Sequence, residues 1–334
     1  MPGPLISILQ PGRETKRAGR GSMVEALARE KDCFFSVIIP TYNRPEKMAQ
    51  CLAALSRLSF PRVRFEVIVI DDGGGSALEP VLDPFAAGLN LTLLTQAHGG
   101  PAAARNRGVK RAKGDFLVFI DDDCEPSRDW LKNLSLRCIE TPERAIGGKT
   151  MNGLPENPYS AASQAILDVV YSYYNADPGQ ASFFASNNLT MPRRLFQAIG
   201  GFDEAFLTSE DRDLCDRWKQ QGFRMTFAPE VLLHHSHDLT LRSFWRQHFN
   251  YGRGAYRHHR AIAGRGTGHF RPDLKFYCSL FRYPFSKGRH GLGMMVLLVL
   301  SQVANALGFF YQGLPKRGRN RNSRSDQVNA RKEP

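Results

Sequence analysis

Two clusters of aspartates follow apolar segments of this sequence. Asp121-Asp122-Asp123 comes directly after the run 115–120, and Asp71-Asp72 directly after the run 65–70. Three adjacent carboxylates repel one another unless a positive charge neutralises them. Oxygen ligands favour Mg²⁺ or Mn²⁺, which proteins usually hold with one or two carboxylates together with substrate phosphates. The pattern therefore predicts a metal site for a nucleotide or pyrophosphate substrate, and the alternative is a solvated acidic turn.

Two further groups of titratable residues lie downstream. Glu210-Asp211 precedes a segment with helical periodicity, where a carboxylate either acts as a general base or only stabilises the first turn of the helix. His234-His-Ser-His237 places three imidazoles in four residues. On a strand, His235 and His237 would lie on one face, although a lone surface histidine is usually inert.

The elements that must position these groups alternate along the chain. Apolar runs predict buried strands, and helical periods lie between them. The expected strands are 35–40, 65–70, 91–95 and 115–120, and the helices 46–58, 78–87, 102–112, 164–174, 211–221 and 239–251. This order indicates an α/β fold with a parallel sheet covered on both faces, in which ligands bind at the carboxyl ends of strands. Both aspartate clusters lie at such ends.

The positive charge of the chain is concentrated in its C-terminal third. The 334 residues carry a formal net charge of +13, yet residues 33–240 contain 21 basic and 25 acidic residues, whereas residues 241–290 contain 11 basic and one acidic residue. A nucleic-acid binder would carry the positive field on its recognition fold, so this class is excluded. The distribution favours contact with a membrane surface or an anionic substrate.

An apolar segment follows the basic one. Residues 292–311 are 20 residues without a charge, long enough to cross roughly 30 Å of hydrocarbon, although Gln302 and Asn305 leave an interfacial or core helix equally open. The six cysteines show no C-x-x-C spacing, which predicts free thiols. We expect a flexible basic extension (1–32), a catalytic domain (33–240), a basic helical extension (241–290), an apolar helix (291–312) and a disordered basic tail (313–334).

Five segments, in order, carry a resemblance to a known family. They are 36–44 (SVIIPTYNR), 69–73 (VIDDG), 100–108 (GPAAARNRG), 119–123 (FIDDD) and 210–214 (EDRDL). Together they resemble the family 2 glycosyltransferases over about residues 34–255. The resemblance implies the GT-A fold, nucleotide-diphospho-sugar transferase-like, with a Rossmann-like, mostly parallel sheet flanked by helices. It also implies transfer of a sugar from a nucleotide-sugar to a hydroxyl acceptor with inversion.

The resemblance also implies roles for residues. Asp72 would hydrogen-bond the base, Arg105 would contact the nucleotide or brace the aspartates, and Asp211 would be the general base. The donor-binding set is Pro40, Thr41, Asn43, Arg44, Asp72, Arg105, Asp121 and Asp122. The metal, Mn²⁺ or Mg²⁺, would be held by Asp121, Asp123 as the main ligand, and His237. The acceptor side would include Asn188, Gly201 and Glu210.

The substrates follow from the resemblance only as classes. The donor would be a UDP-, dTDP- or GDP-linked sugar, and the acceptor a glycolipid or surface polysaccharide precursor, met at the cytoplasmic side of the cell membrane. The segment 245–253 is similar to the Q-x-x-R-W stretch of processive relatives, but Asn250-Tyr251 replaces the Arg-Trp pair and leaves processivity open. The rival function is a non-catalytic or nucleotidyl-transferring membrane-associated protein. A nucleotidyltransferase would have a glycine-rich basic loop, which Thr41–Arg44 is not.

Overall fold

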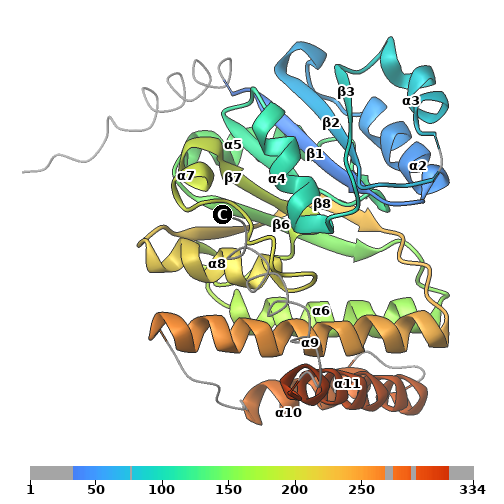
Figure 1. Cartoon of the computed structure of the whole chain (residues 1–334), viewed down its shortest axis with the longest axis vertical. Helices are drawn as coiled ribbons and strands as arrows, with labels where there is room; N and C mark the ends of the chain where they lie inside the picture. The colour runs from blue at the N-terminus through green and yellow to red at the C-terminus, as the bar shows by residue number, and fades with distance from the viewer. Residues whose placement is uncertain (1–32, 76, 268–273, 287–290, 316–334) are drawn as a thin grey trace, which may run out of the picture.

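A computed structural model describes residues 33–75, 77–267, 274–286 and 291–315, so the extension 1–32 and the tail from residue 316 onward lie outside the described residues. Its centre is one eight-stranded sheet of order β3-β2-β1-β4-β7-β6-β8-β5 (Figure 1). The strands are β1 (Phe35–Thr41), β2 (Phe65–Asp71), β3 (Leu91–Thr95), β4 (Phe116–Phe119), β5 (Cys124–Pro126), β6 (Ala145–Asn152), β7 (Leu189–Pro192) and β8 (Met225–His235).

The first half of the sheet is parallel, as expected. β1 pairs in parallel with both β2 and β4, and its residues alternate between two cores: Val37 packs in one and Ile38 in the other. Both faces are covered by helices, which explains the unbroken apolar runs. These helices are α2 (Pro45–Ser56), α3 (Glu79–Ala86), α4 (Pro101–Arg111) and α5 (Trp130–Glu140).

The second half of the sheet is mixed, so the sheet is mostly parallel, as the resemblance implied, and not wholly parallel; β6 and β8 pair in parallel. β7 is antiparallel to both of its neighbours, β4 and β6, and β5 is antiparallel to β8. The chain reverses at Asp121–Asp123, so Cys124 pairs with His235 at the end of β8. This reversal brings the aspartates beside the histidines, a proximity that strand-helix alternation does not predict.

Helices complete the second half and form a separate layer. α6 (Pro158–Tyr174), α7 (Arg193–Ala198) and α8 (Glu210–Gln220) flank the sheet, with short 3₁₀ turns at Arg62–Arg64, Pro178–Gln180 and Ser186–Asn188. α9 (Leu241–Arg265) runs across the molecule beneath α6 and α8, and α10 (Leu274–Ser286) and α11 (Gly291–Gly313) lie farthest from the sheet (Figure 1). α9 is longer than the expected helix because it continues past residue 251 to Arg265, where the left-handed Gly266 ends it.

Two glycines allow α9 and α11 to pack closely. A Cβ on Gly252 would overlap the backbone carbonyl of Asn305, and one on Gly308 would overlap that of Phe249. Within the described ranges, α11 alone is long and apolar enough to cross a membrane. Only 22% of its most apolar 18-residue stretch is buried in the protein. The apolar helix expected at 291–312 therefore exists, with one side against the protein.

Candidate functional site

The carboxylates after β4 are neutralised by an arginine from the segment after β1. Arg44 lies 2.7 Å from Asp122 and 3.0 Å from Asp123, and the Thr41 hydroxyl donates to Asp122 at 2.6 Å. Asp122 is fully buried, and this burial raises its pKa to about 7 despite Arg44. Neither Asp122 nor Asp123 lines the cavity described below, whereas Thr41 and Arg44, which contact Asp122, do, and the assignment of Asp122 to the donor stays a prediction.

Arg105 joins two acidic groups that are far apart in the sequence. Its guanidinium, buried on α4, lies 2.6 Å from Asp121 and 2.8 Å from Glu210. Of the alternatives considered for Arg105, the structure therefore shows bracing of carboxylates. The same bridge explains why Glu210 is not a free acceptor-side group, since its carboxylate is held by Arg105.

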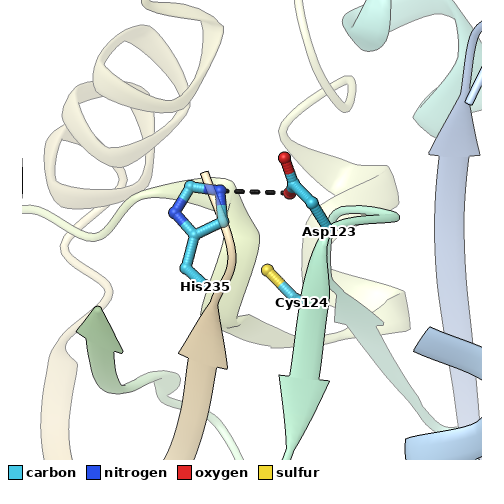
Figure 2. Close-up of side chains that lie close together, drawn as sticks. All are labelled: Asp123, Cys124 and His235. Carbon is cyan, nitrogen blue, oxygen red and sulfur yellow. Dashed lines mark ion pairs between the residues drawn. The ribbon is translucent and has the colours of Figure 1, made fainter. Parts of the chain in front are cut away.

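The histidines after Leu233 meet the aspartates differently than expected. His235 Nε2 lies 3.0 Å from Asp123 Oδ1 (Figure 2), whereas His237 stacks on His235 with ring centroids 4.9 Å apart. The ring in contact with Asp123 is thus His235, which the metal assignment omitted. Burial and the neighbouring His235 lower the pKa of His237 to about 4, so this imidazole is neutral at neutral pH and keeps a lone pair for a ligand.

These residues form a donor set that suits a divalent cation. Asp123, Cys124 and His235 offer ligand atoms within 4.8 Å of one another (Figure 2). Burial raises the pKa of the Cys124 thiol well above its usual value, which makes it a poor ligand. Burial also acts to raise the pKa of Asp123, but His235 and Arg44 outweigh it and hold that pKa low. An ionised carboxylate beside imidazoles fits Mn²⁺ or Mg²⁺ better than a thiolate-seeking metal.

Asp72 organises the loop in front of α4. Its carboxylate accepts from the backbone N–H groups of Gly99 and Gly100, each at 2.8 Å, and from Gln96 Nε2 at 2.7 Å. These bonds hold His98 beside Tyr42, with ring centroids 4.3 Å apart. Both rings line the cavity and were missed by sequence reasoning, although Tyr42 stands inside the segment 36–44 that carried the resemblance.

Asp211 lies in the first turn of α8, directly after a loop that α9 holds in place. Ser209, which precedes the helix, has a left-handed backbone (φ 67°), and Thr208 donates to the backbone oxygen of Asn250 at 2.9 Å. A Cβ on Gly254 of α9 would collide with this loop. Burial and the neighbouring Glu210 raise the pKa of Asp211 to about 7, a value that suits a general base near neutral pH.

Five expected residues lie outside the cavity lining: Asp122 and Asp123, described above, and Asn43, Asn188 and Gly201. The Asn188 side chain is buried and bonds to Trp130, Lys149 and Val231, whereas Asn187 lines the cavity, and the acceptor-side assignment of Asn188 stays a prediction. Gly201 has φ +70° and serves a turn. Asn43 accepts from the backbone N–H of Gly75 at 2.8 Å and orders that loop.

A single cavity of about 1240 Å³ connects the remaining groups to the helical layer. Its polar end is lined by most of the expected site residues: Pro40, Thr41, Arg44, Asp72, Arg105, Asp121, Glu210, Asp211 and His237. Its other end is apolar and is lined by residues of α6, α10 and α11, among them Val170, Phe276, Ala306, Phe309 and Phe310. A ligand with a charged head and an apolar tail would match this arrangement.

Comparisons with known proteins identify the family of this chain. Residues 36–200 match the family model described as glycosyl transferase family 2. The chain is 30% identical over 219 residues to the amylovoran biosynthesis glycosyltransferase AmsB of Erwinia amylovora, covering 60% of this chain and 69% of that protein. It is 30% identical over 226 residues to the pre-mycofactocin glycosyltransferase of Mycobacterium tuberculosis, covering 66% of this chain and 46% of that one. The chain belongs to the family 2 glycosyltransferases and spans about half to two thirds of the length of such relatives.

Solved structures confirm the fold. The mannosyltransferase PcManGT from Pyrobaculum calidifontis, in complex with GDP-Man and Mn²⁺, superposes with a TM-score of 0.56 at 20% identity, over 86% of this chain and 83% of that one. Residues 1–349 of TarS from S. aureus give 0.53 at 18% identity, over 85% and 93%. The GT-A fold that the resemblance implied is therefore correct.

Proposed function

We propose that the protein transfers a sugar from a nucleotide-diphosphate-sugar to a hydroxyl acceptor, with inversion and with a divalent metal. The single observation that carries this proposal is the bridge made by Arg105. This arginine joins Asp121, in the candidate metal and diphosphate cluster, to Glu210, the neighbour of the candidate base Asp211, in one cavity. The candidate group for the leaving diphosphate, Asp121, and the candidate base, Asp211, therefore line the same cavity.

The donor would lie across the carboxyl ends of β1, β2 and β4. Tyr42 and His98 offer ring faces for the nucleobase beside Asp72, and UDP, dTDP and GDP all remain possible. Asp121, Asp123 and the imidazoles of His235 and His237 would hold Mn²⁺ or Mg²⁺. When bound, this ion would neutralise the diphosphate as it departs. PcManGT, named as a complex with GDP-Man and Mn²⁺, supports this choice of cofactor.

Asp211 would act as the base. An ionised carboxylate with its pKa near 7 can take the proton of the acceptor hydroxyl while the hydroxyl oxygen attacks the anomeric carbon. The bond to the diphosphate breaks on the opposite face of that carbon, and the proton ends on an Asp211 oxygen. A single displacement of this kind inverts the anomeric configuration, so a product with retained configuration would contradict the mechanism.

The acceptor would be a glycolipid or a polysaccharide precursor, met at the cytoplasmic side of the cell membrane. Three observations support this choice: the apolar end of the cavity, the basic segment 241–290 and the apolar helix α11. A relative from Methanococcus voltae, 24% identical over 241 residues, is named for a dolichyl N-acetyl-glucosaminyl phosphate substrate. That name is consistent with an acceptor that carries a lipid.

The test is donor binding across a panel of UDP-, dTDP- and GDP-sugars, with and without Mn²⁺, for the wild type, Asp123→Ala and the control Asp83→Ala on the exposed side of α3. We expect Mn²⁺-dependent binding of one donor, followed by slow hydrolysis, in the wild type and the control and not in Asp123→Ala. Donor binding that is unchanged both by the omission of Mn²⁺ and by Asp123→Ala would contradict the proposed metal site. Release of a sugar 1-phosphate in place of a nucleoside diphosphate would establish the rival nucleotidyl transfer, because attack on the α-phosphorus of these donors expels the sugar phosphate.

A further inference from the structure

Helix α11 has two unlike faces. One face is buried against the protein and includes Leu298, Ala304 and Gly308. The other, which we call the outer stripe, consists of large apolar side chains that are 45–78% exposed: Leu292, Val296, Val299, Val303, Leu307 and Phe310. Their spacing of three and four residues places them on one side of a helix. Exposed apolar side chains aligned in this way mark a contact surface.

The buried face holds α11 against the catalytic body over nearly its whole length. Met294 packs against a cluster that contains Phe244 of α9, and Gly308 touches the backbone of Phe249. Farther along, Arg253 Nε donates to Gln312 Oε1 at 3.1 Å. At about 1.5 Å per residue, the span from 294 to 312 is roughly 27 Å, close to the thickness of the hydrocarbon layer.

This attachment decides between a spanning and an interfacial helix. If α11 crossed the bilayer, the parts of α6 and α9 that pack along it would enter hydrocarbon, including Arg246, which lies in α9 between the contacts of Phe244 and Phe249. An arginine at the bilayer centre costs about 3 kcal/mol even on the most lenient scale. A helix in the membrane plane leaves its buried face on the protein and places only the outer stripe among the lipids.

Charge and shape identify the partner as an anionic bilayer. Residues 241–290 contain 11 basic and one acidic residue, and Lys275 and Arg282 are exposed on α10, beside the apolar side chains of Leu274 and Phe285. Basic side chains beside an apolar surface suit acidic headgroups above acyl chains. A soluble protein partner would need no such excess of positive charge.

We propose that α11 lies flat in the interface of an anionic membrane, with its outer stripe in the acyl boundary and α10 beside it. Phe310 belongs to the outer stripe and also lines the cavity, so the apolar end of the cavity opens at the membrane. This opening gives a lipid-linked acceptor a route to Asp211, and only that consequence rests on the proposed function.

Vesicle sedimentation tests the surface. We compare the full chain with the variant Val296→Asn/Val299→Asn/Val303→Asn and with Val63→Asn, a control that changes a side chain 85% exposed on the 3₁₀ turn before β2. On vesicles of phosphatidylcholine and phosphatidylglycerol, the triple variant should partition roughly tenfold or more weakly, and the control as the wild type does. Equal partition of all three proteins would overturn the proposal. Mn²⁺-dependent donor binding, measured in parallel, reports separately on the proposed function.

Depth measurements test the orientation. Leu292→Trp, Val299→Trp and Phe310→Trp are placed in turn on the outer stripe, and the added fluorescence is quenched with lipids brominated near the headgroup or near the chain end. A helix in the plane predicts preferential quenching by the shallow bromine at all three positions. Stronger quenching of Val299→Trp by the deep bromine than of the two end positions would show a spanning helix and overturn the proposal.

Discussion

The strand-end cluster and the helical layer are held together by different forces. Around Asp121–Asp123, buried side chains form ion pairs and hydrogen bonds, such as those of Arg44 and Thr41. Between α9 and α11, by contrast, Gly252 and Gly308 allow backbones to touch, and the contacts are mostly apolar. The arrangement of the first region therefore depends on which side chains are present. The close packing of the second region depends on the absence of a side chain at Gly252 and Gly308.

This difference predicts that the two regions fail separately. A change at the strand ends should abolish turnover and leave membrane binding intact, because no outer-stripe residue takes part in the polar network. A change in the helical layer should weaken stability or membrane binding and leave donor binding intact. Four experiments examine this separation, in order of decreasing effect on turnover.

Replacement of the candidate base should have the largest effect. Asp211→Asn keeps the size of the side chain but cannot accept the acceptor proton, so kcat should fall about 10³-fold while the Kd for the donor changes little. The measurement combines single-turnover kinetics with donor titration, and Asp203→Asn serves as a control on the loop before α8. Normal turnover in Asp211→Asn would remove Asp211 as the base.

Loss of the Arg105 bridge should have a somewhat smaller effect. Arg105→Gln leaves Asp121 and Glu210 without their shared cation, and an unpaired buried carboxylate is costly. We expect kcat/KM to fall about 10²-fold, together with weaker Mn²⁺ binding. Arg107→Gln, on the exposed side of the same helix, should behave as the wild type. Equal losses in the two variants would mean that the change acts through α4 as a whole.

The pH dependence of turnover should reflect the environment of Asp211. Burial and Glu210 raise the pKa of this carboxyl to about 7, so its reactive, ionised form is lost as pH falls through that value. Between about pH 7 and pH 5.5, kcat should fall roughly 15-fold, approaching tenfold per unit only at the acid end, and it should level off above about pH 8. A kcat profile at saturating Mn²⁺ measures this. A flat profile over that range would show that proton removal by Asp211 does not limit turnover.

The sequence predicted the polar region far better than the apolar one. Aspartates after buried strands indicated the site because residue type, burial and strand direction together restrict what such a cluster can do. The contact between Asp123 and His235 was missed because it depends on the antiparallel return of β5, which strand-helix alternation does not encode. The burial of Asn188 could not be predicted, because a buried amide and a ligand-binding amide have the same sequence signal.

The helical layer was open to two interpretations for a similar reason. A charge-free run of 20 residues has the same composition whether it spans a bilayer or lies on its surface. The glycine at 308 indicates that one side of this helix packs against the protein, and it becomes informative only when its partner, Phe249, is known. Small residues reveal close helix packing only after the neighbouring helix has been placed.

The smallest effect on turnover is expected where this packing is disturbed. Gly308→Ala forces its Cβ against the backbone of Phe249, whereas Gly293→Ala, in the same helix, meets no atom within 4 Å. The first should destabilise the helical layer by about 1–3 kcal/mol, and the second should be neutral or stabilising by about 0.5–1 kcal/mol. Urea unfolding and hydrogen exchange of α11 measure these changes, and hydrolysis of the donor should vary less than about twofold in either variant. If Gly308→Ala instead abolished donor hydrolysis, the two regions would be coupled, and the site would need the helical layer for more than access.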